Sequence, residues 1–262
     1  MKYINQSYEI LGSPTSVAEA WAFAAKAARN CYQSEKTNPN ESEEAFCKRL
    51  LLKNTEDMEC NHLSPLEFGT VYLQVPLDHL YKSGMGVRVI TKNNVNYVTT
   101  NLRYLLEHGL MDDLRYAGPP TEHHIKTCAF KLITNRTVMA ELTRHRTLSF
   151  CIESTRYCNY SKDKFGNELT FIHPCWEDAS AVDSYFQSVE LSYMNLVKLK
   201  KWTAQQAAII LPNDLKTTIM MSGFIDDLKH MFKLRALECS GPVHPQMAEL
   251  MKPLYEEWTN TF

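Results

Sequence analysis

Residues 144–157 read RHRTLSFCIESTRY and place three arginines, Arg144, Arg146 and Arg156, within thirteen positions. The arginine side chain presents a planar fork of N–H donors that binds a phosphate or carboxylate with two hydrogen bonds, and it stays charged at any working pH. A cluster of this kind most often binds an anion. The alternative is a solvated helix end with ordinary surface ion pairs, and the flanking sequence has to decide between the two.

The sequence before the cluster predicts a helix. Apolar Val138, Met139 and Leu142 recur at helical spacing within residues 135–143, so the RHR triplet is expected to finish that helix. Successive residues of a helix point about 100° apart. The three side chains of the triplet therefore suit two ligands, or one long ligand that wraps the helix end.

The sequence after the cluster predicts an extended segment over residues 150–159. In such a segment Ile152, Ser154 and Arg156 share one face. A serine hydroxyl both donates and accepts hydrogen bonds, and an arginine beside it supplies a fork of donors. Ser154 and Arg156 are therefore expected to form a small binding site for an anion or a nucleotide.

The spacing RHR-x7-S resembles the signature of the flavin-dependent thymidylate synthases, the ThyX or thymidylate synthase complementing protein family. Further segments resemble that family in the right order, namely AARNCY (27–32), NHLSPLEF (61–68), IILP (209–212) and HMFKLR (230–235). The resemblance covers most of the chain. A lone RHR would be a weak signal, whereas the full motif with ordered accessory segments is a specific one.

The resemblance implies an enzyme that makes dTMP from dUMP. In the family NADPH reduces bound FAD, and a one-carbon unit passes from 5,10-methylenetetrahydrofolate by way of the flavin to dUMP, without an enzymatic thiol nucleophile. It also implies a homotetramer with FAD between subunits. The sequence has no GxGxxG, no Walker loop and no convincing nucleophile constellation. A site rich in arginine and poor in nucleophiles fits a reaction whose difficult chemistry belongs to a cofactor.

Matching the family motif position by position gives each site residue an expected role. The expected catalytic residues are Arg235, Ser154 and His62. The expected FAD-binding residues are Arg144, His145, Arg146, Ser64, Glu67, His230 and His244. The expected dUMP-binding residues are Arg144, Ser154, Thr155, Arg156 and Arg235, of which Arg235 would hydrogen-bond the uracil.

Four positions depart from the family pattern. On the flavin side, Phe224 and Asp226 stand where the family usually has Asn and Arg. Ile152 stands where the family usually has Gln or Glu, and Ala208 where it usually has an arginine that helps to hold dUMP. Losing one hydrogen bond to a charged group weakens binding by roughly ten- to a hundredfold. Neighbouring Lys216 is a candidate replacement. The departures keep two alternatives open: a related flavoenzyme acting on another pyrimidine nucleotide or transferring a different one-carbon group, or a non-catalytic homologue that binds FAD or a nucleotide.

The composition is that of an ordinary globular protein. The chain has 262 residues, 44% of them hydrophobic and 22% charged, which is enough for one large domain or two small ones. A net charge of −2 argues against a general nucleic-acid binder. The amino-terminal residues lack the apolar run of a signal peptide, and no stretch approaches the length of a membrane span. Eight cysteines form no CxxC pair, so we expect reduced thiols in a cytoplasmic protein.

Predicted helices outnumber predicted strands and do not alternate with them one for one, which favours an α+β fold. With the resemblance, this gives a central, mostly antiparallel sheet with helices packed on it. The expected helices cover residues 16–32, 43–54, 101–108, 111–116, 135–143, 181–210 as one helix or two, 216–224, 225–235 and 244–258. The expected strands cover residues 67–75, 127–133 and 169–173.

The whole chain, residues 1–262, is expected to be one domain. Residues 77–121 resemble the family least and read as an inserted subregion, because no linker composition flanks them. Pro65 suits a first helical turn, with Ser64 as its cap. The adjacent His123 and His124 are expected on the surface, and no metal site is expected, because no third ligand lies nearby in sequence.

Overall fold

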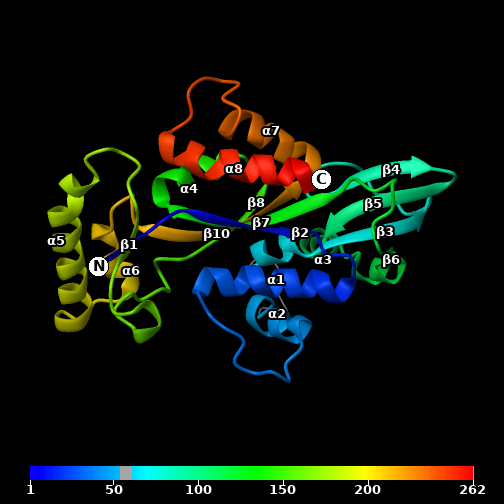
Figure 1. Ribbon diagram of the computed structural model, residues 1–262. Helices are drawn as coiled ribbons and strands as arrows, with labels where there is room; N and C mark the ends of the chain where they lie inside the picture. The colour runs from blue at the N-terminus through cyan, green and yellow to red at the C-terminus, as the bar shows by residue number, and fades with distance from the viewer. Residues whose placement is uncertain (54–60, 262) are drawn as a thin grey trace.

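The chain is built on three sheets (Figure 1). The computed structural model describes residues 1–53 and 61–261. A central antiparallel sheet has the order β2-β7-β10-β8, a second antiparallel sheet has the order β4-β5-β3-β6, and β1 pairs with β9 in parallel. The strands of the central sheet are β2 (Ser7–Gly12), β7 (Thr127–Asn135), β10 (Lys216–Phe224) and β8 (Ser149–Ile152).

Helices cover both faces of the central sheet. In Figure 1, α1 (Val17–Tyr32) lies below the sheet, and α4 (Arg136–Leu142), α7 (Ile225–Arg235) and α8 (Pro245–Thr261) lie above it. Along β10 the side chains alternate: Met220 packs with Ala27 of α1, whereas Ile219 and Met221 pack with the helices of the other face. The prediction of an α+β fold with helices on an antiparallel sheet is confirmed.

The prediction of a helix at residues 216–224 is wrong, because this segment is β10, an inner strand of the central sheet. It pairs with β7 from Lys216↔Asn135 to Phe224↔Thr127, and with β8 on its other side. Both faces of β10 are covered, so its sequence lacks the polar–apolar alternation of a half-exposed strand. A short apolar run of this kind cannot be told from a buried helix by periodicity alone.

The other predicted helices differ from the structure mainly in their ends. The helix at 16–32 is confirmed as α1, and Ser16 Oγ accepts the Glu19 N–H at 3.2 Å, as an N-cap does. The second helix, α2 (Glu43–Leu51), ends earlier than predicted, and residue 54 lies outside the described residues. The predicted 181–210 helix divides into α5 (Asp183–Met194), the π-helical turn η6 (Asn195–Leu199), α6 (Ala204–Ala207) and the 3₁₀ turn η7 (Ala208–Ile210).

The second sheet is built largely by residues 77–121. Its strands are β3 (Thr70–Pro76), β4 (Arg88–Lys92), β5 (Val95–Asn101) and β6 (Ala117–Gly118). Between β5 and β6 lie α3 (Leu102–Glu107), which confirms a predicted helix, and the 3₁₀ helix η3 (Met111–Tyr116). Because β5 pairs with β3 along its whole length, this region is continuous with the strand before it. That it is an insertion remains a prediction.

The end of the central sheet at the left of Figure 1 is closed by α5 and by the pair of β1 (Lys2–Ile4) and β9 (Thr170–Ile172). A separate apolar cluster fills this end, and it includes the stacked rings of Phe171 and Phe186, whose centroids are 4.3 Å apart.

Among the described residues, no helix has both the length and the apolar character that crossing a membrane requires.

Candidate functional site

The arginine-rich triplet lies in a turn that the end of β7 and α4 hold in place. Asn135 Oδ1 accepts the Val138 N–H at 2.9 Å and caps α4, and Asn135 Nδ2 donates to Asp214 Oδ1 at 2.6 Å and to Gln246 Oε1 at 2.7 Å. The helix ends at Leu142, so the triplet follows the helix and does not finish it as predicted. The turn buries the middle residue of the triplet and exposes its two neighbours.

His145 is the buried member of the triplet, 9% exposed, and it contacts the end of α7. Arg235 Nε donates to His145 Nε2 at 3.1 Å, and Arg235 Nη1 donates to Glu141 Oε2 at 2.7 Å. Nη2 of the same guanidinium donates to the Glu141 carbonyl at 3.2 Å. The His230 ring lies 6.5 Å from the His145 ring. These contacts join three of the predicted site residues and add Glu141, which was not predicted.

His145 is a neutral acceptor in this arrangement. Burial, and then the nearby Arg235 and His230, lower the pKa of His145 to about 4. Since arginine only donates, Nε2 of His145 accepts the hydrogen bond and its proton resides on Nδ1. The imidazole therefore orients the guanidinium without adding a second positive charge.

Arg146 lines a cavity of about 470 Å³ between the two four-stranded sheets. Glu67, another predicted residue, lines the same cavity, and its Oε1 accepts from Arg103 Nη1 at 2.6 Å. Within the described residues, Arg146 forms no ion pair, so its donors are available to a ligand. Hydroxyl groups make up much of the remaining polar wall, from Thr70, Thr100, Thr127, Ser149 and Ser222.

Ser154, Thr155 and Arg156 lie in a turn, so the prediction of an extended segment here is wrong beyond Ile152, where β8 ends. The carbonyl of Ser154 accepts from the N–H groups of Tyr157 at 3.1 Å and Cys158 at 2.9 Å. The turn nevertheless brings the predicted pair together, since the Arg156 N–H donates to Ser154 Oγ at 3.3 Å. Arg156 Nε also donates to the neutral amide of Gln205 at 3.2 Å.

His62, Ser64 and His244 lie apart from these groups. His62 and Ser64 are exposed at the entry to the 3₁₀ helix η2 (Ser64–Phe68). Ser64 is the first residue of that helix and makes no capping hydrogen bond, so its predicted capping role is wrong. His244 precedes α8, and its ring packs edge-on against Trp176 with centroids 5.8 Å apart. A single chain therefore brings Arg235, His145 and His230 together, but it does not bring His62, Ser64 or His244 into contact with them.

The cysteines near the motif are not activated as thiolates. Burial raises the pKa of the Cys158 thiol to about 11. A hydrogen bond with Cys31, together with burial, raises the pKa of Cys151 well above its ordinary value. Both groups are therefore thiols at neutral pH, in agreement with the prediction of packed thiols.

The departures from the family pattern occupy defined places. Ile152 is half-buried and packs against the apolar cluster beneath α7 and α8, and Ala208 opens η7. Lys216 Nζ donates to Glu153 Oε2 at 2.6 Å and is held there by the ion pair.

His124 was expected on the surface, but it is only 5% exposed, and its Nε2 lies 3.0 Å from the Leu73 carbonyl. The wall of the second sheet therefore uses His124 as a buried polar group.

Some residues of the site were missed because they carry no sequence signal of their own. Glu141 lies in the last turn of α4, and its partner Arg235 is 94 residues later in the sequence, so no local spacing indicated the contact. Arg103 joins the cavity wall only because α3 packs beside η2. Such long-range neighbours follow from the fold and not from a local motif.

Comparison with known proteins gives the following likenesses. The family model described as thymidylate synthase complementing protein matches residues 15–261. A curated flavin-dependent thymidylate synthase from Haloarcula marismortui is 29% identical over 185 residues, which cover 61% of this chain and 71% of that protein.

Two solved structures are similar in outline. The UMP/dUMP methylase PolB from Streptomyces cacaoi, bound with 5-Br UMP, has a TM-score of 0.47 and 15% identity, over 99% of this chain and 91% of that one. Thymidylate Synthase X from Helicobacter pylori, with FAD and dUMP, has a TM-score of 0.44 and 15% identity, over 96% and 92%. Likeness at this level does not extend to individual site residues.

Proposed function

The chain belongs to the thymidylate synthase complementing protein family, and from that premise we propose that it is an FAD-dependent thymidylate synthase acting on dUMP. The proposed reaction is the reductive methylation of dUMP to dTMP, with NADPH as reductant and 5,10-methylenetetrahydrofolate as one-carbon donor. The family resemblance that the sequence predicts is confirmed by the match over residues 15–261. The substrate, the co-substrates and the roles of the site residues are the content of the proposal.

The observation that carries the proposal is the fixed guanidinium of Arg235. Three of its N–H groups are used, on His145 Nε2 and on the side chain and carbonyl of Glu141. A guanidinium has five N–H donors, so one remains on each terminal nitrogen. Two such donors suit the carbonyl groups of a uracil ring. Hydrogen bonds from a cation to these carbonyls favour the electron-rich form of the ring, which the transfer of a one-carbon unit to C5 requires.

The charge state of His145 supports the same role. A protonated imidazole would repel Arg235 and could not accept its Nε–H, whereas the neutral ring fixes the guanidinium plane. A preorganised donor does not have to reorient when charge develops in the transition state. Arg235 is therefore proposed to bind and polarise the uracil, and His145 to position Arg235.

The cavity that Arg146 and Glu67 line fits part of FAD. FAD carries two phosphate groups, and Arg146 is an arginine without a carboxylate partner among the described residues. The hydroxyl-rich wall supplies donors and acceptors for the polar edge of a ring or a ribityl chain. When bound, FAD would supply the redox and one-carbon carrier chemistry. We propose that Arg144, His230, His244 and Ser64 complete its binding.

The turn that carries Ser154, Thr155 and Arg156 is proposed to bind the phosphate of dUMP. Arg156 is exposed, and its Nε contacts a neutral amide, so the guanidinium keeps both its charge and its terminal donors for an anion. The Ser154 hydroxyl already accepts from the Arg156 backbone and can still donate. This arrangement supports a phosphate-binding role, and no side chain in residues 1–53 or 61–261 accepts a hydrogen bond from the Ser154 hydroxyl as an activating base would.

We propose that the complete site forms between subunits of a homotetramer. Arg146 lines the cavity proposed for FAD, but Arg235 and Ser154 do not. His62 does not line this cavity either, and its side chain is exposed. Residues that share one ligand but do not meet within a protomer can meet across a subunit interface. Sedimentation velocity of the protein with and without FAD would measure the assembly, and a stable monomer that turns over dUMP would contradict this part of the proposal.

The decisive experiment is tritium release from [5-³H]dUMP with FAD, NADPH and methylenetetrahydrofolate. Release requires loss of the proton at uracil C5, so it reports the chemistry and not binding alone. We expect sustained release that depends on the folate and is lost in Arg235→Ala and Arg156→Ala. A protein that binds FAD but releases no tritium would contradict the proposal.

A second candidate substrate is another pyrimidine nucleotide, and Ile152 favours it because the side chain offers no hydrogen bond where the family usually has one. Turnover of UMP and dUMP by the wild type and by Ile152→Gln would separate the candidates, with Ile152→Val as the matched control that adds no polar group. If dUMP is the substrate, the Gln variant should bind it about tenfold more tightly. A clear wild-type preference for dUMP would remove the second candidate.

A further inference from the structure

A second cavity, of about 790 Å³, lies on the face of the central sheet opposite to the Arg235–His145 pair. Met220 of β10 faces α1, and Thr218, two residues earlier, faces the same side because strand side chains alternate. Thr218 Oγ1 donates to Glu153 Oε2, and Glu153 lines this cavity. Helices α4 and α7, which carry the Arg235 cluster, cover the other face (Figure 1).

The floor of the cavity is a buried acid–base pair. The side chain of Glu153 is only 1% exposed, and that of Lys216 is 17% exposed. Both oxygens of Glu153 are satisfied: Oε2 accepts from Lys216 Nζ at 2.6 Å and from Thr218, and Oε1 accepts from the Tyr160 hydroxyl at 2.9 Å. The carboxylate accepts three hydrogen bonds from described residues, whereas the ammonium uses one of its three donors on a described residue.

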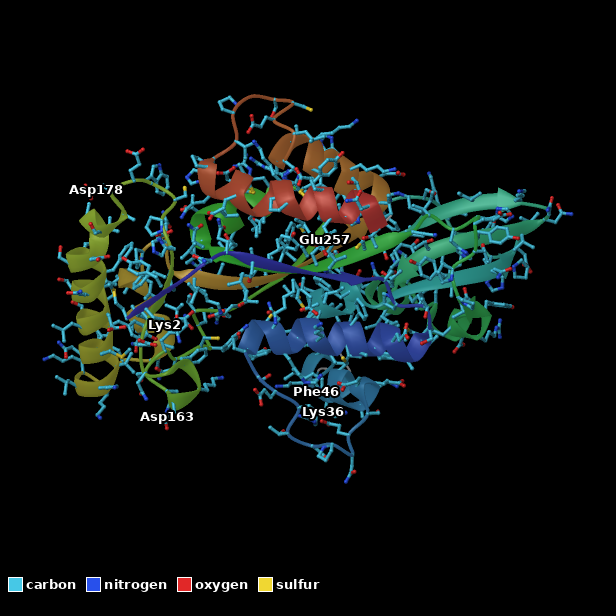
Figure 2. All side chains as sticks on the ribbon, in the orientation of Figure 1. Lys2, Lys36, Phe46, Asp163, Asp178 and Glu257 are labelled. Carbon is cyan, nitrogen blue, oxygen red and sulfur yellow. The ribbon has the colours of Figure 1, made fainter. Side chains whose placement is uncertain are left out.

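Hydrogen bonds connect the rim of the cavity to the strands that form its floor. Lys164 Nζ donates to the carbonyls of Tyr32 and Gln33, both at 3.3 Å, and so joins the 160–168 segment to the end of α1. Asn30, one turn earlier, donates through Nδ2 to the Cys151 and Thr218 carbonyls at 2.9 and 3.1 Å. The opposite wall is β1 and β9, where Lys2 pairs with Glu168 at 3.3 Å. In Figure 2, Lys2 marks that wall, and Asp163 marks the start of the 3₁₀ turn η4 (Asp163–Phe165), which contains Lys164.

Stability alone does not account for the pair at the floor. Removing two charges from water is costly, and replacing a buried ion pair by apolar residues of similar volume is often neutral or stabilising. Glu153 and Lys216 adjoin an apolar cluster that includes Tyr160 and Leu215, so apolar residues would have suited their positions. A charged pair that opens onto a cavity is better explained by a ligand.

The charges of the lining define the ligand class. Glu153 and Lys216 neutralise each other, as do Lys2 and Glu168, and the remaining charges of the lining are those of Lys164 and Glu35. Lys164 contacts carbonyl groups and, among the described residues, no carboxylate. Lys216 and Lys164 both line the cavity and both keep N–H donors that no described residue accepts, so an anionic group in the cavity would find donors on two sides. The volume lies in the range of small-molecule sites, roughly 300–1,000 Å³.

We propose that this cavity is a second ligand site, for a small organic anion that carries one phosphate monoester or carboxylate on a hydroxyl-bearing body. The hydroxyl groups of that body suit the uncharged polar side chains of the lining, from Gln33, Ser34, Thr37 and Thr170. The anionic group contacts Lys216 and Lys164, and the body lies against the β1–β9 wall. A di- or triphosphate is disfavoured, because the lining as a whole carries no net charge, with three lysines and three glutamates. The lining of this cavity includes neither Ser154 nor Arg156 of the proposed dUMP site and shares no residue with the cavity proposed for FAD, although Glu153 directly precedes Ser154.

Isothermal titration calorimetry of the purified full chain tests the proposal with ribose 5-phosphate and gluconate. The two probes share a polyhydroxyl body and distinguish a phosphate monoester from a carboxylate. We expect one of them to bind saturably. Lys164→Met should weaken that binding tenfold or more, because a charge-assisted hydrogen bond is lost. Lys36→Met is the matched control: this exposed lysine of the neighbouring loop pairs with Glu43 at 3.1 Å and does not line the cavity (Figure 2).

The floor is tested with Lys216→Met/Glu153→Gln, which removes both charges together and avoids a buried, unpaired carboxylate. This variant should also weaken binding of the probe tenfold or more, with a thermal melt verifying the fold.

Ribose 5-phosphate could instead occupy the proposed dUMP site, so Arg156→Ala is included and should bind the probe as the wild type does. Binding that is lost in Arg156→Ala but kept in Lys164→Met, or no binding of either probe, would overturn the proposal. Tritium release by Lys164→Met should equal that of the wild type.

Discussion

Arg235 Nε donates to His145 Nε2 across 3.1 Å and so joins the last residue of α7 to the turn after α4, ninety residues earlier in the chain. The contact is a cation held by a neutral ring, and the carboxylate of Glu141 completes it at 2.7 Å. The proposed uracil-binding group is therefore oriented in advance of substrate binding, and each partner of Arg235 can be tested separately.

Stability should fall with acid because of His145. Its pKa is lowered to about 4 in the folded protein, from an ordinary value of 6.5, so the unfolded chain binds more protons between these two pH values. The free energy of unfolding is unaffected above pH 6.5 and decreases as the pH falls through 4, by about 3 kcal/mol in total. Urea denaturation at pH 7 and at pH 4.5 measures this. His145→Gln, which still accepts from Arg235, should lose less stability, and equal losses in both proteins would contradict the assignment.

Neutralising Glu141 should weaken catalysis without unfolding the protein. Glu141→Gln keeps the backbone contact to Arg235 but removes the charge that holds Nη1, so we expect tritium release from dUMP to fall about tenfold. Glu44→Gln removes a carboxylate from an exposed helical pair with Lys48 and should leave the rate unchanged. A Glu141→Gln enzyme as fast as the control would show that Arg235 needs no such partner.

Loss of Arg146 should weaken FAD binding. The guanidinium lines the 470 Å³ cavity without an ion pair among the described residues, whereas the other arginine of that wall, Arg103, pairs with Glu67 and Glu107, so Arg146→Ala removes the unpaired cation. We expect FAD to bind at least tenfold more weakly, measured by quenching of flavin fluorescence. Arg115→Ala alters an exposed arginine that stacks on Tyr116 and serves as the control. Equal FAD affinity in the two variants would place the flavin elsewhere.

Asn135 should matter more for stability than an ordinary helix cap. It caps α4 and also donates to Asp214 and Gln246, all within the buried end of the central sheet. Asn135→Ala should cost about 2–4 kcal/mol, since it removes a cap and leaves buried partners unsatisfied. Asn101→Ala removes the cap of α3, a single hydrogen bond to Tyr104, and should cost about 1 kcal/mol. Chemical denaturation of both variants gives the comparison.

The sequence predicts those elements whose signal is local. A serine cap followed by an alanine-rich run is sufficient for α1, and the spacing RHR-x7-S is sufficient to single out the arginines of the motif. The helix predicted at 216–224 was wrong because β10 is covered on both faces, which removes the alternation that marks a strand.

The site itself was only partly predictable. The resemblance indicated Arg235 and His145, but their contact depends on how α7 packs over α4, which no local pattern encodes. The ion pair between Glu153 and Lys216 was not predicted, because it too depends on a long-range contact. They lie 63 residues apart and meet only because β8 and β10 are neighbours in the sheet.

The order of strands in the central sheet has a consequence for biosynthesis. β8 lies at the edge of the sheet and pairs with β10, which is made 64 residues later, and β10 also separates it from β7. In a nascent chain that has emerged only as far as β8, this strand of the arginine motif has no partner, because β10 has not yet been synthesised. Residues 216–224 must therefore be synthesised before this sheet can close, so its folding is expected to be slow, as for other topologies dominated by distant contacts.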